Sequence, residues 1–453
     1  MTRRPWVVGN RWDSLDGVRP QTLPKVSVIV AHYEQPGELA RTLSALSTQD
    51  YPRELLEIVV ADDGSAGDVL VPPGVTLVRQ DDRGFRLAAA RNLGARASTG
   101  DVLCFLDADT APEPGYVRAL TRLPALLPEA VTVGRRRHAD FSGIDAETPV
   151  IEAVIGRELP EPAWLAEEYA RSRDLLDADD RSYRFVIGAV IACSRRLFEE
   201  TGGFDESFST YGGEDWEWAH RMWQAGAVLA HVPTAVAWHD GPEWAERTDS
   251  GLERANAQTM TLLSSIPVGG SAPRGLLSAV PDLVVRLRGT HTREALFIAV
   301  DSILTAFPRS RVMLDATSGL DIDDPRIVIE GEGEGDGDGD GDGDGDGDGD
   351  GDEPEARVLW ELDRPVVVLE SAGIAEIVAG LGAGDVGTVD LVDSAGSSAG
   401  VLHSRRALRR AARWGTAEGF ETLTVRAEGV HLLRSNPHVE AWVGGWGGPD
   451  RFR

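Results

Sequence analysis

The sequence predicts an α/β fold with a Rossmann-like, mostly parallel sheet, followed by a second, degenerate copy of the same fold. Two observations carry this prediction. Short, nearly all-apolar runs alternate with helical patterns between residues 25 and 110, as expected for parallel strands that helices cover on both faces. The same alternation returns after residue 280, in segments that align with the first ones without gaps.

The first strand–helix–strand unit lies near the amino end. Residues 26–31 and 56–61 are two apolar runs, and each is predicted to form a strand. Between them, Pro36 opens a pattern that places Leu39 and Leu43 on one helical face. Because the connections are short, the two strands are expected to pair in parallel.

Acidic residues follow the predicted strands. Asp62 and Asp63 come after the second strand, and Asp107 and Asp109 come after a third strand predicted over 101–106. In open α/β sheets, ligands bind beyond the carboxyl ends of the strands. We therefore expect a functional site where these acids converge.

An internal repeat sets the predicted domain organisation. Residues 24–30 align with 281–287, and residues 191–196 align with 401–406. The predicted parts are an N-terminal extension over 1–24, a first domain over 25–265, a linker over 330–355, and a second domain made of 266–329 and 356–453.

The two predicted copies differ in chemistry. Residues 107–109 correspond at best to 370–372, which contain one acid where the first copy has two. The second copy also has no equivalent of Glu214 and Asp215. A functional site is therefore expected in the first domain only.

Composition excludes several classes of function. The chain has 453 residues and a net charge of -29, and glycine alternates with Glu or Asp over 331–352. This alternation favours an extended, disordered acidic linker over a calcium site. So acidic a chain repels nucleic acid, and the sequence has no run of 18 apolar residues that could span a membrane.

The cysteines and the amino end indicate a compartment. Cys104 and Cys193, the only two, stand in apolar strand-like runs, and residues 1–10 contain no apolar signal segment. Both features indicate buried thiols in a reducing compartment. We expect a cytoplasmic protein, or one that is peripheral to the membrane through a partner. The oligomeric state stays open.

Three residues of the first domain suit a diphosphate and its metal. Asp107 and Asp109 form a D-x-D pair at a strand end. Two such carboxylates suit Mg²⁺ or Mn²⁺ bound together with phosphate oxygens, although in an acidic protein the pair is more often a solvated turn. Arg86, in the first turn of a helix predicted over 84–94, can pair with a diphosphate.

A second group lies further along the chain. Two glycines precede Glu214, Asp215 and Trp216. A carboxylate beside an indole can have a raised pKa and act as a general base; the alternative is a pair of acids that complements a helix dipole. His239 follows a strand-like run and, as a neutral imidazole, would complete a mixed oxygen and nitrogen site for manganese.

Taken in this order, the motifs resemble the family 2 glycosyltransferases of GT-A fold, over about residues 25–246. The motifs are Val26-Ser-Val-Ile-Val-Ala-His-Tyr-Glu34, Asp62-Asp-Gly-Ser65, Gly84-Phe-Arg86 with Ala90-Arg-Asn92, Asp107-Ala-Asp109 and Gly202-Gly-Phe-Asp-Glu206 followed by Gly212-Gly-Glu-Asp215. The last stretch also looks like the C-terminal part of β-1,4-galactosyltransferases and of chondroitin-type polymerases. Five ordered motifs at family-like spacing make this resemblance specific.

The resemblance implies a role for each matching residue. Those expected to bind the nucleotide-sugar are Ala31, His32, Tyr33, Asp62, Asp63, Arg86 and Asp107. Asp109 would bind Mn²⁺ or Mg²⁺, with His239 as a further ligand. Asp215 would be the catalytic base and Glu214 would face the acceptor. Trp216 and Trp238 would be stacking walls for the acceptor sugar. Glu34 stands where the family often has Asn, which leaves the shape of the base pocket open.

The resulting prediction is a metal-dependent inverting glycosyltransferase. It would move a hexose or an N-acetylhexosamine from a nucleotide-sugar, expected to be a UDP-sugar, to a hydroxyl of a glycan or small-molecule acceptor. One alternative is a catalytically silent protein that binds a nucleotide-sugar or a glycan. A nucleotidyltransferase is disfavoured, because residues 32–36 contain no glycine-rich phosphate loop. The second domain is expected to have a structural or acceptor-binding role.

Overall fold

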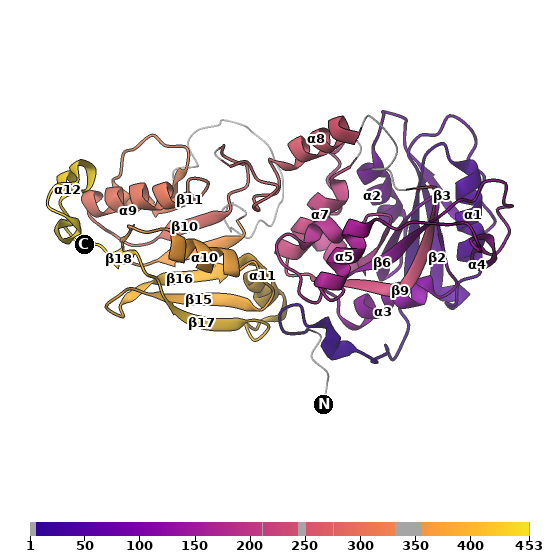
Figure 1. Cartoon of the computed structure of the whole chain (residues 1–453), viewed down its shortest axis with the longest axis horizontal. Coiled ribbons are helices and arrows are strands. Elements are labelled where there is room, and N and C mark those ends of the chain that lie inside the picture. Colours follow the sequence, from indigo (N-terminus) through magenta and orange to yellow (C-terminus); the bar gives the residue numbers. More distant parts are fainter. Residues whose placement is uncertain (1–5, 211, 243–250, 275, 331–355, 453) are drawn as a thin grey trace, which may run out of the picture. The chain divides into compact units, whose positions relative to one another are not determined.

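The structure is a computed structural model that describes residues 6–210, 212–242, 251–274, 276–330 and 356–452 (Figure 1). The chain divides into two compact units, Met1–Leu262 and Leu263–Arg453. The sequence placed this boundary three residues later. The acidic linker predicted over 330–355 lies, except for residue 330, outside the described residues. Among those that are described, no helix is both long and apolar enough to cross a membrane.

The first unit is built on one sheet with a parallel half and a mixed half. In spatial order its strands are β3 (Thr76–Arg79), β2 (Leu56–Asp62), β1 (Val26–His32), β4 (Val102–Asp107), β8 (Val190–Ser194), β6 (Ala130–Ala139), β9 (Val228–Asp240) and β5 (Thr110–Pro112), and β7 (Glu158–Leu159) pairs with β6. β1 pairs in parallel with β2 and β4, as predicted, and every residue of β1 is buried. β8 is antiparallel to both of its neighbours.

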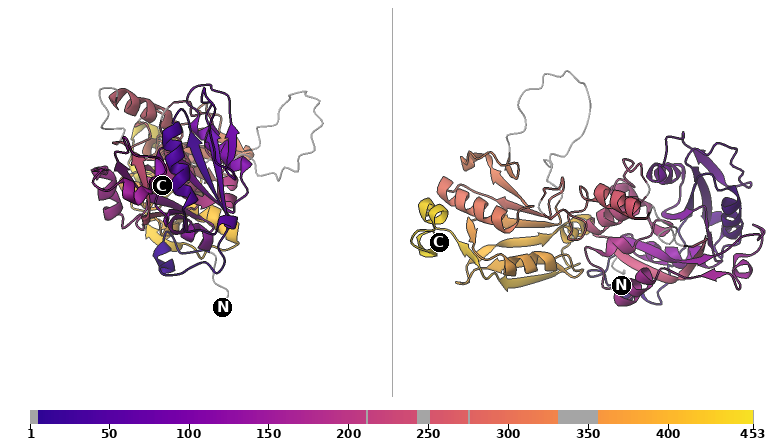
Figure 2. Two further views of the ribbon diagram at one scale, coloured as in Figure 1. Left: turned by 90° about the vertical axis from the view of Figure 1, so that its right-hand side faces the viewer. Right: turned by 45° about the horizontal axis from the view of Figure 1, so that its top comes forward.

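Several helices of the first unit, α1, α2 and α3 among them, pack against this sheet (Figures 1 and 2). The helices of the unit are α1 (Pro36–Ser47), α2 (Leu87–Ala97), α3 (Tyr116–Leu126), α4 (Val150–Ala153), α5 (Ala163–Arg171), α6 (Arg195–Glu200), α7 (Glu214–Gln224) and α8 (Gly251–Leu262). α1 begins at Pro36, whose fixed φ suits a first helical position, and it buries Leu39 and Leu43. α2 begins at Leu87, so Arg86 occupies the N-cap position, and its predicted place in the first turn was wrong.

The second unit repeats the strand order and the strand directions of the first. Its main sheet runs β12 (Ile327–Glu330), β11 (Arg311–Asp315), β10 (Leu283–Leu287), β13 (Val358–Leu362), β16 (Ser398–Ser404), β15 (Val386–Val392) and β17 (Glu421–Arg426), and β14 (Val366–Val368) pairs with β18 (Val430–Leu432). Its helices are α9 (Arg293–Ala306), α10 (Ala372–Gly380), α11 (Arg405–Trp414) and α12 (Val439–Gly444). β10 to β13 are parallel and β16 is antiparallel to both neighbours, which confirms the predicted degenerate second copy.

The register of β13 corrects one detail of the predicted alignment. Val358 lies opposite Leu283 as Val102 lies opposite Val26, and β14 follows β13 at the spacing at which β5 follows β4. Residues 107–109 therefore align with Asp363-Arg-Pro365 and not with 370–372. Proline takes the place of Asp109, and its side chain offers no metal ligand.

Candidate active site

The carboxyl ends of β1, β2 and β4 meet at one edge of the first sheet, as the sequence predicted. His32 lies opposite Asp62 and Ala31 lies opposite Asp107. The backbone N–H of Asp63 donates to the His32 carbonyl at 2.8 Å, and that of Ala108 donates to the Ala31 carbonyl at 2.9 Å. The segments that follow β2 and β4 are thereby hydrogen-bonded to the last two residues of β1.

Asp62 is the most enclosed acid of this edge, with no exposed surface. Its carboxylate accepts hydrogen bonds from the backbone and hydroxyl of Ser65 at 3.1 and 2.6 Å, lies 2.8 Å from His32 Nδ1, and pairs with Arg79 at 3.0 Å. Burial raises the pKa of Asp62, but the bonds from Ser65 and His32 outweigh burial and the pKa is lowered. Because protein groups bond to both of its carboxylate oxygens, Asp62 has a structural role and holds Ser65, His32 and Arg79 together at this edge.

Asp63 and Tyr33 line the outer part of the same edge. The Asp63 carboxylate accepts the backbone N–H of Arg86 at 2.8 Å and an amide N–H of Gln80, and it thereby fixes the start of α2. Burial raises the pKa of Asp63. The Tyr33 ring is 47% exposed, so one aromatic face is open to a flat ligand.

Arg91 of α2 links the two groups of acids, and we did not predict it as a site residue. Its guanidinium is buried, with Nη2 at 2.9 Å from Asp107 Oδ1 and Nη1 at 3.1 Å from Glu214 Oε1. Burial disfavours its charge, but Asp107 and Glu214 more than compensate and the pKa of Arg91 is raised. The available signal was its place in the Ala90-Arg-Asn92 part of the matched motif, to which we assigned no role.

Gly188 provides the space that this arrangement needs. A Cβ on Gly188 would lie 2.8 Å from Nη1 of Arg91 and 3.0 Å from Cβ of Asp215. The first contact is closer than real Cβ atoms show, and the second would require Asp215 to shift. Glycine thus lets the backbone before β8 approach the buried arginine and the acid together.

Glu214 and Asp215 are the first two residues of α7, and they differ in how far they are buried. Glu214 is 5% exposed, and burial together with the charge of Asp215 raises its pKa to about 7, against the opposing charge of Arg91. Asp215 is partly exposed and accepts the backbone N–H groups of Gly188 at 3.0 Å and Trp216 at 2.9 Å. Burial raises the pKa of Asp215 as well. Raised pKa values suit carboxylates that exchange protons near neutral pH.

The pKa of Glu214 predicts a pH dependence of stability. Since the pKa is raised from 4.5 to about 7 on folding, the folded state binds the extra proton between these values. The free energy of unfolding should therefore fall as pH rises through this window, by about 3 kcal/mol from this group. In Glu214→Gln, urea unfolding at pH 5 and pH 7.5 should show a smaller difference than in the wild type.

An exposed acid supplies the matched control for that comparison. Glu167→Gln removes a solvated carboxylate of α5 and should keep the wild-type dependence on pH. Equal pH dependence in Glu214→Gln and the wild type would contradict the raised pKa.

Asp109 and His239 form the predicted metal pair on the other side of Asp107. Asp109 Oδ2 lies 3.4 Å from His239 Nε2 and accepts an amide N–H of Gln35 at 3.3 Å. Burial raises the pKa of Asp109, but the bonds from His239, Gln35 and Thr110 outweigh burial and the pKa is lowered. His239 lies inside β9, which extends further than the predicted strand.

The tautomer of His239 suits a metal ligand. Its Nδ1 lies 3.2 Å from the Gly241 carbonyl, which can only accept, so Nδ1 carries the hydrogen. The bond that lowers the pKa of Asp109 requires a hydrogen on Nε2 as well, as in the imidazolium form. In the neutral ring with its hydrogen on Nδ1, the lone pair of Nε2 would face the Asp109 carboxylate instead. Two facing acceptors fit a cation that completes its shell with water and phosphate oxygens. No group of three or more ligating side chains occurs in the described part of the chain.

The two tryptophans predicted for the acceptor have different surroundings. Trp216 is partly exposed at the start of α7, with its ring 6.1 Å from that of Tyr183. Trp238 is 2% exposed, donates to Glu113 at 2.9 Å and lies under the guanidinium of Arg137 at 4.1 Å. A buried and covered ring offers no face to a sugar, so the predicted stacking role of Trp238 was wrong.

Comparisons with known proteins agree with this geometry. The family model described as "Glycosyl transferase family 2" matches residues 27–202, and one described as "N-terminal domain of galactosyltransferase" matches residues 174–238. The chondroitin synthase of Escherichia coli is 28% identical over 53% of this chain and 38% of its own length. The hyaluronan synthase of Pasteurella multocida is 29% identical over 48% of this chain and 24% of its own.

A smaller relative is the validoxylamine A glucosyltransferase of Streptomyces hygroscopicus, 30% identical over 46% of this chain and 53% of its own. The chain thus spans about a quarter to a half of the length of these relatives. Among solved structures, the mannosyltransferase PcManGT of Pyrobaculum calidifontis with GDP-Man and Mn²⁺ is 22% identical with a TM-score of 0.39, over 54% of this chain and 67% of its own.

Proposed function

Because its first unit belongs to glycosyl transferase family 2, we propose that this chain transfers a sugar from a nucleotide-sugar to a hydroxyl group. The donor is a UDP-sugar that carries a hexose or an N-acetylhexosamine, and the acceptor is a glycan or a small molecule. The single observation that carries this proposal is the buried Arg91, which bridges Asp107 to Glu214 and so ties the D-x-D pair to the start of α7.

The donor lies at the carboxyl edge of the parallel strands. Tyr33 stacks on the base, and Asp63 with its neighbours binds the base or the ribose. The half-buried Arg86, 3.9 Å from Glu206, pairs with the nucleotide. A guanidinium at the start of a helix suits an anion, because the N-terminal dipole adds to its charge.

Asp109 and His239 would hold a divalent cation, Mn²⁺ or Mg²⁺. Such a cation would supply positive charge to neutralise the departing nucleotide. Asp107, bound to Arg91, lies on the ribose side.

Asp215 takes the proton of the acceptor hydroxyl. Its two oxygens already accept backbone N–H groups, which fix the carboxylate in one orientation. The acceptor oxygen then attacks the anomeric carbon from the face opposite the nucleotide, which inverts the configuration. Glu214, held by Arg91, faces the acceptor, and Trp216 forms one wall of the acceptor site.

The described residues of the second unit lack two features of the proposed donor and acceptor sites. Pro365 takes the place of Asp109, and the described residues between α11 and β17 contain no counterpart of α7. We assign to it a structural or acceptor-binding role.

Metal-dependent binding of UDP tests the donor site. By titration calorimetry, Mn²⁺ should strengthen the binding of UDP to the wild type. In Asp109→Asn this effect should weaken by about 10-fold or more, because one of the two protein ligands is lost. Asp68→Asn, which neutralises an exposed acid in the loop after β2, should bind like the wild type. Equal enhancement by Mn²⁺ in Asp109→Asn and the wild type would exclude Asp109 as the ligand.

A further inference from the structure

The segment that precedes β1 is an integral part of the first unit, although it lies outside the matched family region. Asn10 is 1% exposed, and its side chain donates to the carbonyls of Leu175 at 2.6 Å and Leu229 at 3.0 Å. Its Oδ1 accepts the backbone N–H of Leu229 at 2.9 Å. A buried amide with its donors and acceptor satisfied fixes this segment to β9.

Apolar contacts also attach this N-terminal segment to the first unit. Val7 and Leu15 of this segment join a buried cluster with Leu123 of α3 and Leu127. The guanidinium of Arg122 donates to the carbonyls of Leu15 at 2.9 Å and Val18 at 3.0 Å. Residues 6–24 are therefore held over α3 by both core packing and hydrogen bonds.

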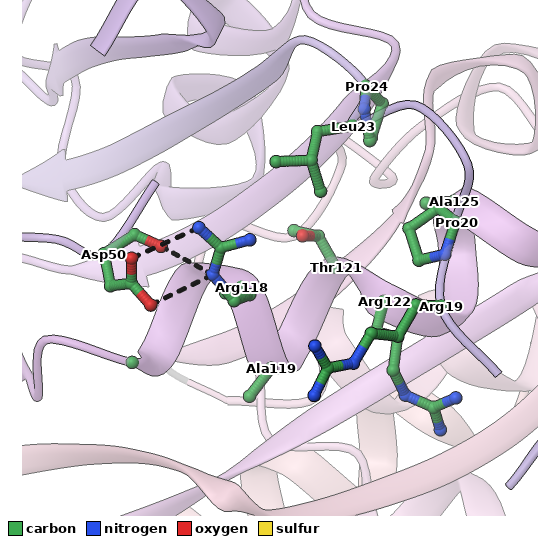
Figure 3. Close-up of a pocket in the computed structure, with 11 residues that line it drawn as sticks. Arg19, Pro20, Leu23, Pro24, Asp50, Arg118, Ala119, Thr121, Arg122 and Ala125 are labelled. Atoms are coloured by element: carbon green, nitrogen blue, oxygen red, sulfur yellow. Dashed lines mark hydrogen bonds and ion pairs between the residues drawn. The ribbon is translucent and has the colours of Figure 1, made fainter. Parts of the chain in front are cut away.

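This attachment encloses a pocket of about 640 Å³ between residues 19–24 and α3 (Figure 3). Its walls are mostly apolar, formed by Pro20, Leu23 and Ala119 among others. The volume lies within the range of pockets that bind small molecules, about 300–1,000 Å³.

The charge of the pocket is positive in a chain of net charge -29. Arg19, Arg118 and Arg122 line it, and Asp50 is its one acidic residue. Asp50 is already paired with Arg118, whose Nε and Nη2 donate to the two carboxylate oxygens at 3.1 and 3.2 Å (Figure 3). Arg19 is exposed and makes no hydrogen bond or ion pair with any described residue. Arg19 thus adds a positive charge to the pocket that no described acid balances.

The pocket is remote from the donor edge. Its wall includes Pro24, which stands before the first residue of β1, whereas Tyr33 follows the last. The seven residues of β1 separate the two ends by roughly 20 Å. A ligand in this pocket therefore does not compete with the nucleotide.

We propose that this pocket binds a small organic anion, in which a phosphate or carboxylate group is joined to an apolar body. The anionic group pairs with Arg19, since a guanidinium fork binds such groups with charge-assisted hydrogen bonds. The apolar body covers Leu23 and Ala119. An inorganic anion alone would fill little of the pocket and would leave these walls in contact with water.

Titration calorimetry with hexyl phosphate, in the full-length protein, tests this site. We expect hexyl phosphate to bind at one site in the wild type. Hexanol and inorganic phosphate should each bind with an affinity at least about 10-fold lower. Arg19→Gln removes the unpaired charge and Ala119→Phe fills the apolar space. Arg19→Gln should weaken the binding of hexyl phosphate by about 10-fold or more, because one charge-assisted bond is lost. Ala119→Phe should weaken it by a similar factor, because the added ring occupies the space of the apolar chain. Arg171→Gln, which removes an exposed arginine of α5, should bind as the wild type does.

Three outcomes would overturn the proposal: equal binding of hexyl phosphate and hexanol, equal affinity in all variants, or displacement of hexyl phosphate by UDP. Vesicles that contain phosphatidic acid distinguish the source of the anion. Displacement of hexyl phosphate by these vesicles, lost in Arg19→Gln, supports a membrane lipid as ligand. Arg19-dependent binding of hexyl phosphate without such displacement supports a free metabolite.

Discussion

In Asp215→Asn the turnover number is expected to fall by about 100-fold or more, the usual contribution of a general base. The substituted amide cannot take a proton from the acceptor. The two carboxylate oxygens of Asp215 accept the backbone N–H groups of Gly188 and Trp216. In the amide, the –NH₂ group replaces one of these oxygens and faces one of the two N–H donors, so that hydrogen bond is lost. The measurement is release of UDP under saturating donor and acceptor, beside calorimetry of UDP and Mn²⁺, which should be unchanged.

Glu199→Gln is the matched control for this variant. Glu199 is an exposed acid at the end of α6, paired only with Arg195 at 3.5 Å, and its loss should leave turnover unchanged. A turnover number within a few-fold of the wild type in Asp215→Asn would remove Asp215 from the reaction and would assign the base to another group.

Arg91→Gln is expected to lower the free energy of unfolding by about 3–5 kcal/mol, as when one partner of a buried ion pair is removed. Arg91 separates Asp107 from the buried Glu214 and bonds to both. When the charge of Arg91 is removed, Glu214 must either stay ionised in an apolar surrounding or bind a proton. Urea unfolding at pH 7.5 measures the loss, and unfolding at pH 5, where Glu214 is protonated, should show a smaller one.

The control lies on the same helix. Arg96 is a surface arginine whose side chain is 62% exposed, and it pairs with Glu206 at 3.1 Å. Arg96→Gln should change the free energy of unfolding by no more than about 1 kcal/mol. If Arg91→Gln does not accumulate in folded form, Arg91→Lys is the second variant. It keeps the charge but lacks the planar fork that reaches both acids, so its loss of unfolding free energy should lie between those of Arg96→Gln and Arg91→Gln. A cost in Arg91→Gln as small as in Arg96→Gln would contradict the bridging role.

The fold was predictable because its pattern is local. The all-apolar runs at β1 and β2 and the proline that opens α1 specify strand, helix and strand without reference to the rest of the chain. The second copy followed from the same pattern. Its register could not be predicted, since the alignment of β13 with β4 depends on pairing with β10 across a long stretch of chain.

The site was predictable where a motif ends a strand. Asp63, Asp107 and Asp109 lie at the predicted edge. Burial and pairing between distant residues are not local, so the sequence did not reveal that Arg91 joins Asp107 to Glu214. For the same reason it did not show that protein groups surround Asp62.

The most direct measurement is release of UDP from a panel of UDP-sugars with Mn²⁺, in the presence and absence of sugar acceptors. The account predicts turnover with one donor, faster when an acceptor is present, and abolished in Asp109→Asn and Asp215→Asn. Turnover that persists in both variants would contradict the assigned site. If no UDP-sugar binds or turns over in the wild type, the donor proposed for this edge of the sheet is wrong.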